Sequence, residues 1–218
     1  MIELRRRYKL DGGGYNLPLT YQEVTYLQGD GVGTYINTKQ NINANSAVYC
    51  RLEYLEQAST NQSMGIWDNS GTSRFFFGLE AATGELFVGL GNKVIRSWIG
   101  MPVVGEILTF ELDLYNRVCG RYGYKVDFDG TFNSLPSYLF FYLFAGNTQS
   151  FDAISGRVNY YAKVRIYETI FKENNIIVKH LIPCYRKLDN VAGMYDLVSG
   201  EFYTNAGTGE FIVGPDVN

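Results

Sequence analysis

The sequence is poor in the residues that most often carry catalysis or bind transition metals. It contains one histidine, His180, and three cysteines, Cys50, Cys119 and Cys184, which lie far apart in the chain. None of the cysteines has a second ligand at the spacing of a zinc site. The sequence therefore predicts no His/Cys metal cluster and no nucleophile–histidine triad. Each cysteine lies in an apolar, strand-like run, so we expect buried free thiols and a reducing compartment.

Charged residues and long apolar runs are also scarce. Charged residues make up 19% of the chain and the formal net charge is -3, so no excess of positive charge favours a nucleic-acid partner. No apolar run approaches the roughly 20 residues that a membrane-spanning helix needs. The start of the chain does not read as a signal peptide. We therefore expect synthesis in the cytoplasm, with neither nucleic acid nor membrane as a partner.

The N-terminal segment differs in composition from the rest of the chain. Its basic cluster comprises Arg5, Arg6 and Arg7. Three glycines follow at positions 12–14, and glycine loses more backbone entropy on ordering than any other residue. We expect residues 1–17 to form a flexible basic arm and residues 18–218 to form one folded domain. The arm is either a solvated terminus or a segment that docks on a partner protein or an acidic surface.

Tyrosine, phenylalanine and glycine are abundant, with 18, 14 and 24 residues, a composition typical of short strands joined by tight turns. Apolar residues alternate with polar ones over residues 48–55, 108–115 and 158–167, the pattern of half-buried antiparallel strands. We therefore predict an all-β fold, a two-sheet antiparallel β-sandwich. Residues 138–145 are apolar on both faces, which predicts a central strand covered on both sides or one with a concave aromatic outer face. The best helical candidate is a single turn around residues 171–175.

Two groups of motifs resemble a known family. The first is residues 21–27 followed by Gly-Thr-Tyr-Ile-Asn-Thr at 33–38, and the second is the closing segment at 182–187, 193–196 and 200–211. Together they resemble the concanavalin A-like lectins and glucanases, a laminin-G-like jelly-roll family common in structural proteins of gut-bacterial phages and prophages. Asn37 stands where the family usually has aspartate. The closing segment also predicts a hairpin in its own right, because Ser199-Gly200 is a two-residue turn signal.

The resemblance makes Glu111 and Asp113 a candidate catalytic pair. Residues two apart on a strand share a face, and retaining glucanases use two carboxyls about 5–5.5 Å apart. However, Tyr115 and Asn116 occupy the positions where the family's acid/base carboxyl is expected, and neither can protonate a leaving oxygen as a carboxylic acid does. We therefore expect no enzyme, with the two carboxylates on the solvated outer face of a strand. His180 lies in an apolar run, so we expect it to be structural.

A sugar site would combine an aromatic platform with planar polar side chains. The residues that we assign to it are Trp67, Asp68, Asn69, Arg74, Tyr115 and Tyr124. The alternative is that Trp67 belongs to the core and that Asp68 and Asn69 only form a turn. Relatives in the family often bind calcium through loop oxygens, and Asp127 and Asp129 form an acidic loop here. Asp68 lies in a second acidic loop. Because neither loop shows a regular series of ligands, calcium and any other metal are left open.

The resemblance implies a function in a virus particle. We expect a phage virion structural or decoration protein, oligomeric in the assembled particle, whose lectin-like sandwich binds other virion proteins or cell-surface glycans for host attachment. The arm with Arg5, Arg6 and Arg7 is its candidate docking element. The alternatives are a free-standing carbohydrate-binding lectin and, less favoured, a glycoside hydrolase of the glucanase type.

Overall fold

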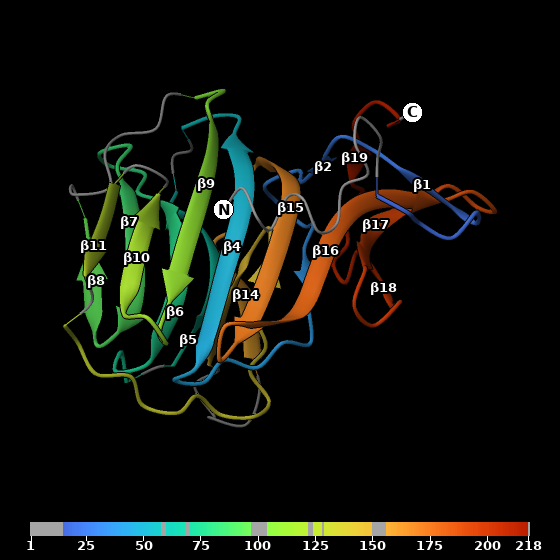
Figure 1. Ribbon diagram of the computed structural model, residues 1–218. Helices are drawn as coiled ribbons and strands as arrows, with labels where there is room; N and C mark the ends of the chain where they lie inside the picture. Colours follow the sequence, from blue (N-terminus) through green and yellow to red (C-terminus); the bar gives the residue numbers. More distant parts are fainter. Residues whose placement is uncertain are drawn as a thin grey trace.

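Two β-sheets pack face to face in the computed structural model, which describes residues 15–57, 60–68, 70–96, 104–121, 124–127, 129–149 and 156–217 (Figure 1). The eleven-stranded sheet contains β1 (Tyr21–Glu23), β2 (Leu27–Gln28), β4 (Ser46–Tyr54), β9 (Ile107–Asp113), β10 (Val118–Arg121), β11 (Tyr124–Asp127), β15 (Val164–Glu173), β16 (Ile176–Arg186), β17 (Val191–Asp196), β18 (Phe202–Thr204) and β19 (Ile212–Val213). The eight-stranded sheet contains β3 (Ile36–Asn37), β5 (Gln62–Trp67), β6 (Arg74–Leu79), β7 (Leu86–Gly91), β8 (Lys93–Ile95), β12 (Tyr142–Leu143), β13 (Gly146–Gln149) and β14 (Gly156–Asn159). The predicted all-β sandwich is confirmed.

Antiparallel pairing dominates both sheets. The larger sheet runs in the order β11-β10-β9-β4-β15-β16-β17-β18, and the smaller in the order β14-β13-β5-β6-β7-β8. One pair departs from the prediction, because β13 lies parallel to β5, with Gly146 opposite Gly65. A parallel pair needs a long crossover, and here the chain visits the larger sheet between β5 and β13. The described residues contain no helix long and apolar enough to cross a membrane.

The core lies between the sheets and follows the alternation in the sequence. In β4, Val48, Cys50 and Leu52 are fully buried, and they belong to one apolar cluster with residues of β6 and β9. Phe77 of β6 stacks on Phe110 of β9 across the interface, with ring centroids 4.8 Å apart and an interplanar angle of 14°. Offset aromatic stacking contributes beyond the buried area alone. The cysteines at 50, 119 and 184 are free and buried, as we expected.

The predicted helical turn at 171–175 is wrong. Phe171 and Glu173 continue β15, which pairs with β16 to form a hairpin closed by Asn174 and Asn175. Both asparagines have positive φ, 50° and 64°, as a type I′ turn requires, and asparagine tolerates that region better than most residues. The left-handed pair reverses the chain within two residues, so no helical turn forms.

Residues 141–145 are buried on both sides, as the composition predicts, whereas Tyr138 and Phe140 are partly exposed, and the run does not form one long strand. Leu139, Phe141 and Leu143 are completely buried, and Tyr142 is 9% exposed. Only residues 142–143 pair as a strand, and Phe144 follows with a φ of 66°. This left-handed residue turns the chain between β12 and β13, so the apolar run ends before β13 begins at Gly146.

The closing segment extends one end of the larger sheet. β16, β17 and β18 form an antiparallel ladder, in which Leu181 lies opposite Asp196 and Gly193 lies opposite Thr204. Figure 1 shows these strands, with β1, β2 and β19, reaching beyond the smaller sheet. The predicted hairpin is present, but its loop spans residues 197–201 rather than two residues, with Gly200 at a φ of 76°.

The described chain begins at Tyr15, within the segment that we assigned to the arm. The Tyr15 hydroxyl donates a hydrogen bond to Glu168 of β15 at 2.5 Å, and its ring meets His180 of β16 edge-on. His180 is 2% exposed, and its Nε2 lies 2.7 Å from the same carboxylate. Residues 1–14, with Arg5, Arg6 and Arg7, lie outside the described residues.

Candidate functional site

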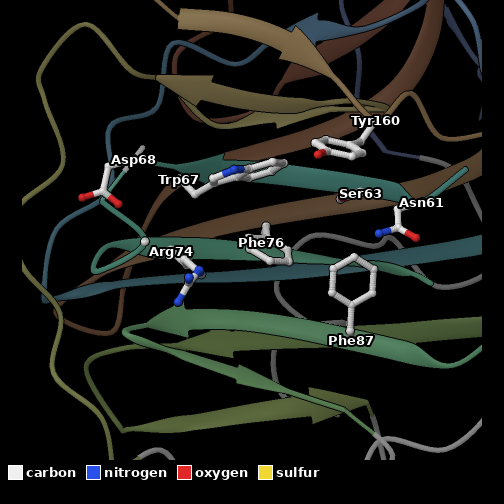
Figure 2. Close-up of a pocket in the computed structure, with 9 residues that line it drawn as sticks. Asn61, Ser63, Trp67, Asp68, Arg74, Phe76, Phe87 and Tyr160 are labelled. Carbon is white, nitrogen blue, oxygen red and sulfur yellow. The ribbon is translucent and has the colours of Figure 1, made fainter. Parts of the chain in front are cut away.

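Aromatic side chains gather on the outer face of the eight-stranded sheet. Alternation in β5, β6 and β7 sends one set of residues to the core and leaves Trp67, Phe76 and Phe87 on the opposite face. Ring centroids are 4.8 Å apart between Trp67 and Phe76 and 5.4 Å apart between Phe76 and Phe87. The three rings therefore form a continuous row across three neighbouring strands, which we call the aromatic row (Figure 2).

Glycines on neighbouring strands make room for the aromatic row. A Cβ at Gly89 would lie 2.2 Å from Cε1 of Phe76, and a Cβ at Gly146 would lie 2.5 Å from Cη2 of Trp67. The Phe87 ring lies against Gly78 in the same way. Since glycine has no side chain, each ring packs against backbone instead of standing away from the sheet.

A pocket of about 330 Å³ opens over this row. It is lined by Asn61, Ser63, Trp67, Asp68, Gly71, Arg74, Phe76, Phe87 and Tyr160. Figure 2 shows Arg74 and Asp68 toward one end of the pocket and Asn61 toward the other, with Trp67 and Tyr160 between them. This size lies at the lower end of the range typical of small-ligand sites.

Tyr160 completes the aromatic lining, and sequence reasoning missed it. It follows β14 with a φ of 56°, and its ring centroid lies 5.5 Å from that of Trp67. The backbone oxygen of Tyr160 accepts a hydrogen bond from the Ser63 N–H at 3.0 Å, which ties it to β5. The ring is 45% exposed. No local pattern marks this tyrosine, because its neighbours in the pocket lie about a hundred positions earlier.

The polar residues of the pocket have different roles. Asp68 is used within the β5–β6 turn, where it accepts hydrogen bonds from the Ser70 hydroxyl at 2.6 Å and the Ser73 N–H at 3.2 Å. Asn61 accepts the Ala81 N–H at 2.9 Å through Oδ1. Arg74 stands directly opposite Trp67 in the β5–β6 register. Asp68 is therefore mainly a turn residue, whereas Arg74 faces the pocket.

The structure brings together three of the residues predicted for the sugar site: Trp67, Asp68 and Arg74. Tyr115 lies in the turn after β9, in the other sheet, and does not line this pocket. Asn69 lies outside the described residues, and the Tyr124 side chain is likewise not described, although its backbone belongs to β11.

Glu111 and Asp113 share the outer face of the larger sheet, but they are not solvated as we expected. Glu111 is 7% exposed and Asp113 is completely buried. Asp113 accepts hydrogen bonds from the backbone N–H of Asn116 at 2.7 Å and from its side-chain amide at 2.8 Å. This carboxylate therefore caps the turn that follows β9. Both its oxygens have structural partners, which does not favour a role as a nucleophile.

The carboxylates of Asp129 and Asp68, one from each acidic loop considered for calcium, have separate partners and do not converge on one point. Asp129 pairs with Lys93 at 3.8 Å, and Asp68 serves its own turn. Over the described residues, no group of three or more histidine, cysteine, aspartate or glutamate side chains is arranged to hold a metal ion.

A second pocket, of about 410 Å³, lies in the closing segment beside β17 and β18. Its polar groups serve local structure: Asp189 pairs with Arg186 at 2.6 Å, and Oδ1 of Asn205 accepts the Tyr35 N–H at 3.1 Å. The pocket over the aromatic row is therefore the stronger candidate.

Comparison with protein-family models, with curated proteins and with solved structures finds no match for this chain. The interpretation of the site thus depends on its own geometry.

Proposed function

We propose that this protein is a carbohydrate-binding β-sandwich module that acts without catalysis. The observation that carries the proposal is the pocket in which Trp67 and the half-exposed ring of Tyr160 stand beside polar groups. An aromatic ring offers a flat apolar surface to the C–H face of a pyranose, and it loses little conformational entropy on binding. A few polar groups around such a surface then orient the ligand.

The polar lining suits hydroxyl groups. The pocket is lined by Ser63, Asn61 and Tyr160, whose side chains carry a hydroxyl, an amide and a phenol. Each can donate a hydrogen bond, and hydroxyls and phenols can also accept one. The volume of about 330 Å³ suits a ligand of one or two sugar rings rather than a long polymer segment enclosed on all sides.

We infer a concanavalin A-like jelly roll and a place in a phage virion from the sequence motifs. The opening motif spans β1, β2 and β3, and the closing motif spans β16, β17 and β18, so both fall within the folded sandwich. The resemblance supports the virion assignment, the oligomeric state in the particle and the virion partners. The basic, glycine-rich composition of the arm supports the docking role of Arg5, Arg6 and Arg7. A free-standing lectin is the alternative, and it would use the same pocket.

A glycan array tests the binding function. Wild-type protein should give specific signals that Trp67→Ala and Tyr160→Ala each weaken by about tenfold or more, because each removes part of the stacking surface. Trp67→Phe should keep part of the signal, since a ring remains. Tyr115→Ala is the matched control, an exposed tyrosine in the other sheet, and should bind as wild type does. Binding that is insensitive to Trp67→Ala would contradict the proposal.

Particle composition tests the virion assignment. We expect mass spectrometry of purified phage particles to find this protein. A variant lacking residues 1–14 should fold normally and be lost from the particles. Detection of the protein only outside intact particles would favour the free-standing lectin, and undiminished incorporation of the shortened chain would exclude the docking role of the arm.

A further inference from the structure

Arg74 lines the pocket without an internal counter-charge. Its guanidinium makes no ion pair or hydrogen bond with any residue that the structure describes. Four other arginines differ from Arg74, since a carboxylate lies within 3.4 Å of each of Arg96, Arg121, Arg165 and Arg186. A partly buried guanidinium interacts strongly with any planar anion that reaches it, because the surroundings screen it less than bulk water does.

The surroundings hold the guanidinium in place rather than neutralising it. A Cβ at Gly71 would lie 2.5 Å from Nη2 of Arg74, so the guanidinium packs closely against the backbone of the β5–β6 turn. Asp68 is the carboxylate in the pocket lining, and it accepts hydrogen bonds from Ser70, Thr72 and Ser73. Its oxygens are thus directed at its own turn. The residue opposite Arg74 on β7 is Gly91, which has no side chain to cover the cation.

The spacing between cation and platform fits one sugar unit. Arg74 and Trp67 are directly opposite in an antiparallel pair, where the Cβ atoms lie roughly 4.5–5.5 Å apart. A carboxylate carried directly on a pyranose ring lies within a few ångströms of the ring centre. A ring stacked on Trp67 can therefore direct its carboxylate at the guanidinium, which binds carboxylates through two parallel hydrogen bonds.

We propose that the pocket selects acidic sugars, namely saccharide units with a ring-borne carboxylate such as uronic or nonulosonic acids. This inference rests on the proposed carbohydrate-binding function and specifies its ligand class. Arg74 binds the carboxylate, and the aromatic row with Tyr160 binds the ring.

An array of acidic polysaccharides, each printed beside its carboxyl-reduced neutral form, tests the selection. The probes are polygalacturonate, alginate, hyaluronan and polysialate. Wild-type protein should bind one or more acidic forms at least about tenfold better than the reduced form, the factor expected for a charge-assisted hydrogen-bonded pair. Arg74→Gln should remove this preference. Arg74→Lys should keep part of it, because lysine retains the charge but not the two-pronged geometry.

The controls separate this inference from the function on which it rests. Arg96→Gln removes an arginine that pairs with Glu80 outside the pocket, and it should leave the preference unchanged. Thermal unfolding of every variant checks that the fold is intact. Two outcomes would overturn the selection of acidic sugars and leave the binding function standing. One is Trp67-dependent binding that is equal for the acidic and reduced forms, and the other is an acidic preference that survives Arg74→Gln. Absence of Trp67-dependent binding to any glycan overturns both.

Discussion

At the scale of single residues, glycine positions decide where the aromatic rings of the site can lie. Phe76 is only 6% exposed although it points away from the core, because its ring packs against Gly89 on the next strand and against Trp67 and Phe87. A ring held in this way has few alternative rotamers. The row is therefore ordered before a ligand arrives, which lowers the entropic cost of binding.

Gly89→Ala should lower both stability and glycan binding. The new methyl group would overlap the Phe76 ring, and overpacking of this kind costs about 1–3 kcal/mol. Chemical denaturation measures the change in the free energy of unfolding. Phe76→Ala provides the control: if the overlap is the cause, Gly89→Ala should cost less in that background than in the wild type. If the two substitutions instead lower the free energy of unfolding additively, the overlap between the new methyl group and the Phe76 ring is not the cause.

The thiols at 50, 119 and 184 should resist alkylation in the native protein. Burial raises the pKa of each thiol to about 12, and the thiolate is the reactive form. Iodoacetamide at about pH 8 should label the unfolded protein, whose thiols titrate near their ordinary pKa, far faster than the native protein. Mass spectrometry of the intact chain measures the labelling. Rapid labelling of Cys50 without unfolding would contradict the buried position.

At the scale of elements, short turns and one buried carboxylate hold the strand ladder together. The β15–β16 hairpin depends on two residues with positive φ, Asn174 and Asn175. At the next hairpin, Asp196 is fully buried and accepts hydrogen bonds from the His180 N–H at 2.8 Å and the Ser199 hydroxyl at 2.6 Å. It also pairs with Lys179 at 3.5 Å.

Substitution of Asn174 tests the left-handed turn. Asn174→Val should lower the free energy of unfolding by about 1–2 kcal/mol, because a β-branched residue is disfavoured at positive φ. Asn174→Gly should be close to neutral or slightly stabilising. The side chain is exposed, so loss of packing does not enter the comparison. Equal denaturation midpoints for the two variants would show that the turn is not left-handed.

Asp196→Ala should be among the costly changes in the closing segment. It leaves the buried Lys179 without its carboxylate partner and removes the acceptor for two backbone N–H groups, at a cost of about 3–5 kcal/mol. Asp189→Ala is the matched control, because its pair with Arg186 is exposed to solvent and should contribute much less. Similar unfolding midpoints for the two variants would contradict the importance of the buried pair.

At the scale of the whole molecule, the two sheets share one core. The apolar cluster takes residues from strands of both, including Phe77 and Phe110, which stack across the interface. Neither sheet can keep its inner face buried without the other, so the sandwich should unfold as a unit.

Phe110→Ala tests this dependence. The change should cost about 3–5 kcal/mol through the cavity that it leaves. It should lower the unfolding midpoint measured by tryptophan fluorescence and by far-ultraviolet circular dichroism to the same extent, although Phe110 belongs to the sheet that lacks Trp67. Separate transitions for the two signals would mean that the sheets unfold independently.

Much of the fold could be predicted because alternation is local. The pattern over residues 48–55 indicates which side chains of β4 face the core, and the structure agrees. Trp67 and Arg74 could also be placed together, since they flank one short turn and pair across it. The helical turn at 171–175 and the single strand at 138–145 were wrong because positive φ angles at Asn174, Asn175 and Phe144 turn the chain there. Amino-acid composition predicts such angles only weakly.

The sequence by itself determined the all-β class and the buried faces of the strands, and it placed Trp67 and Arg74 in one candidate site, because strand alternation and a turn act over a few neighbouring residues. Only the tertiary structure decided that Tyr160 stands beside Trp67, that glycines on other strands make room for the aromatic row, and that Asp68 is hydrogen-bonded within its own turn. Those facts depend on contacts between segments far apart in the chain, and strand order and register are set by the packing of the whole core.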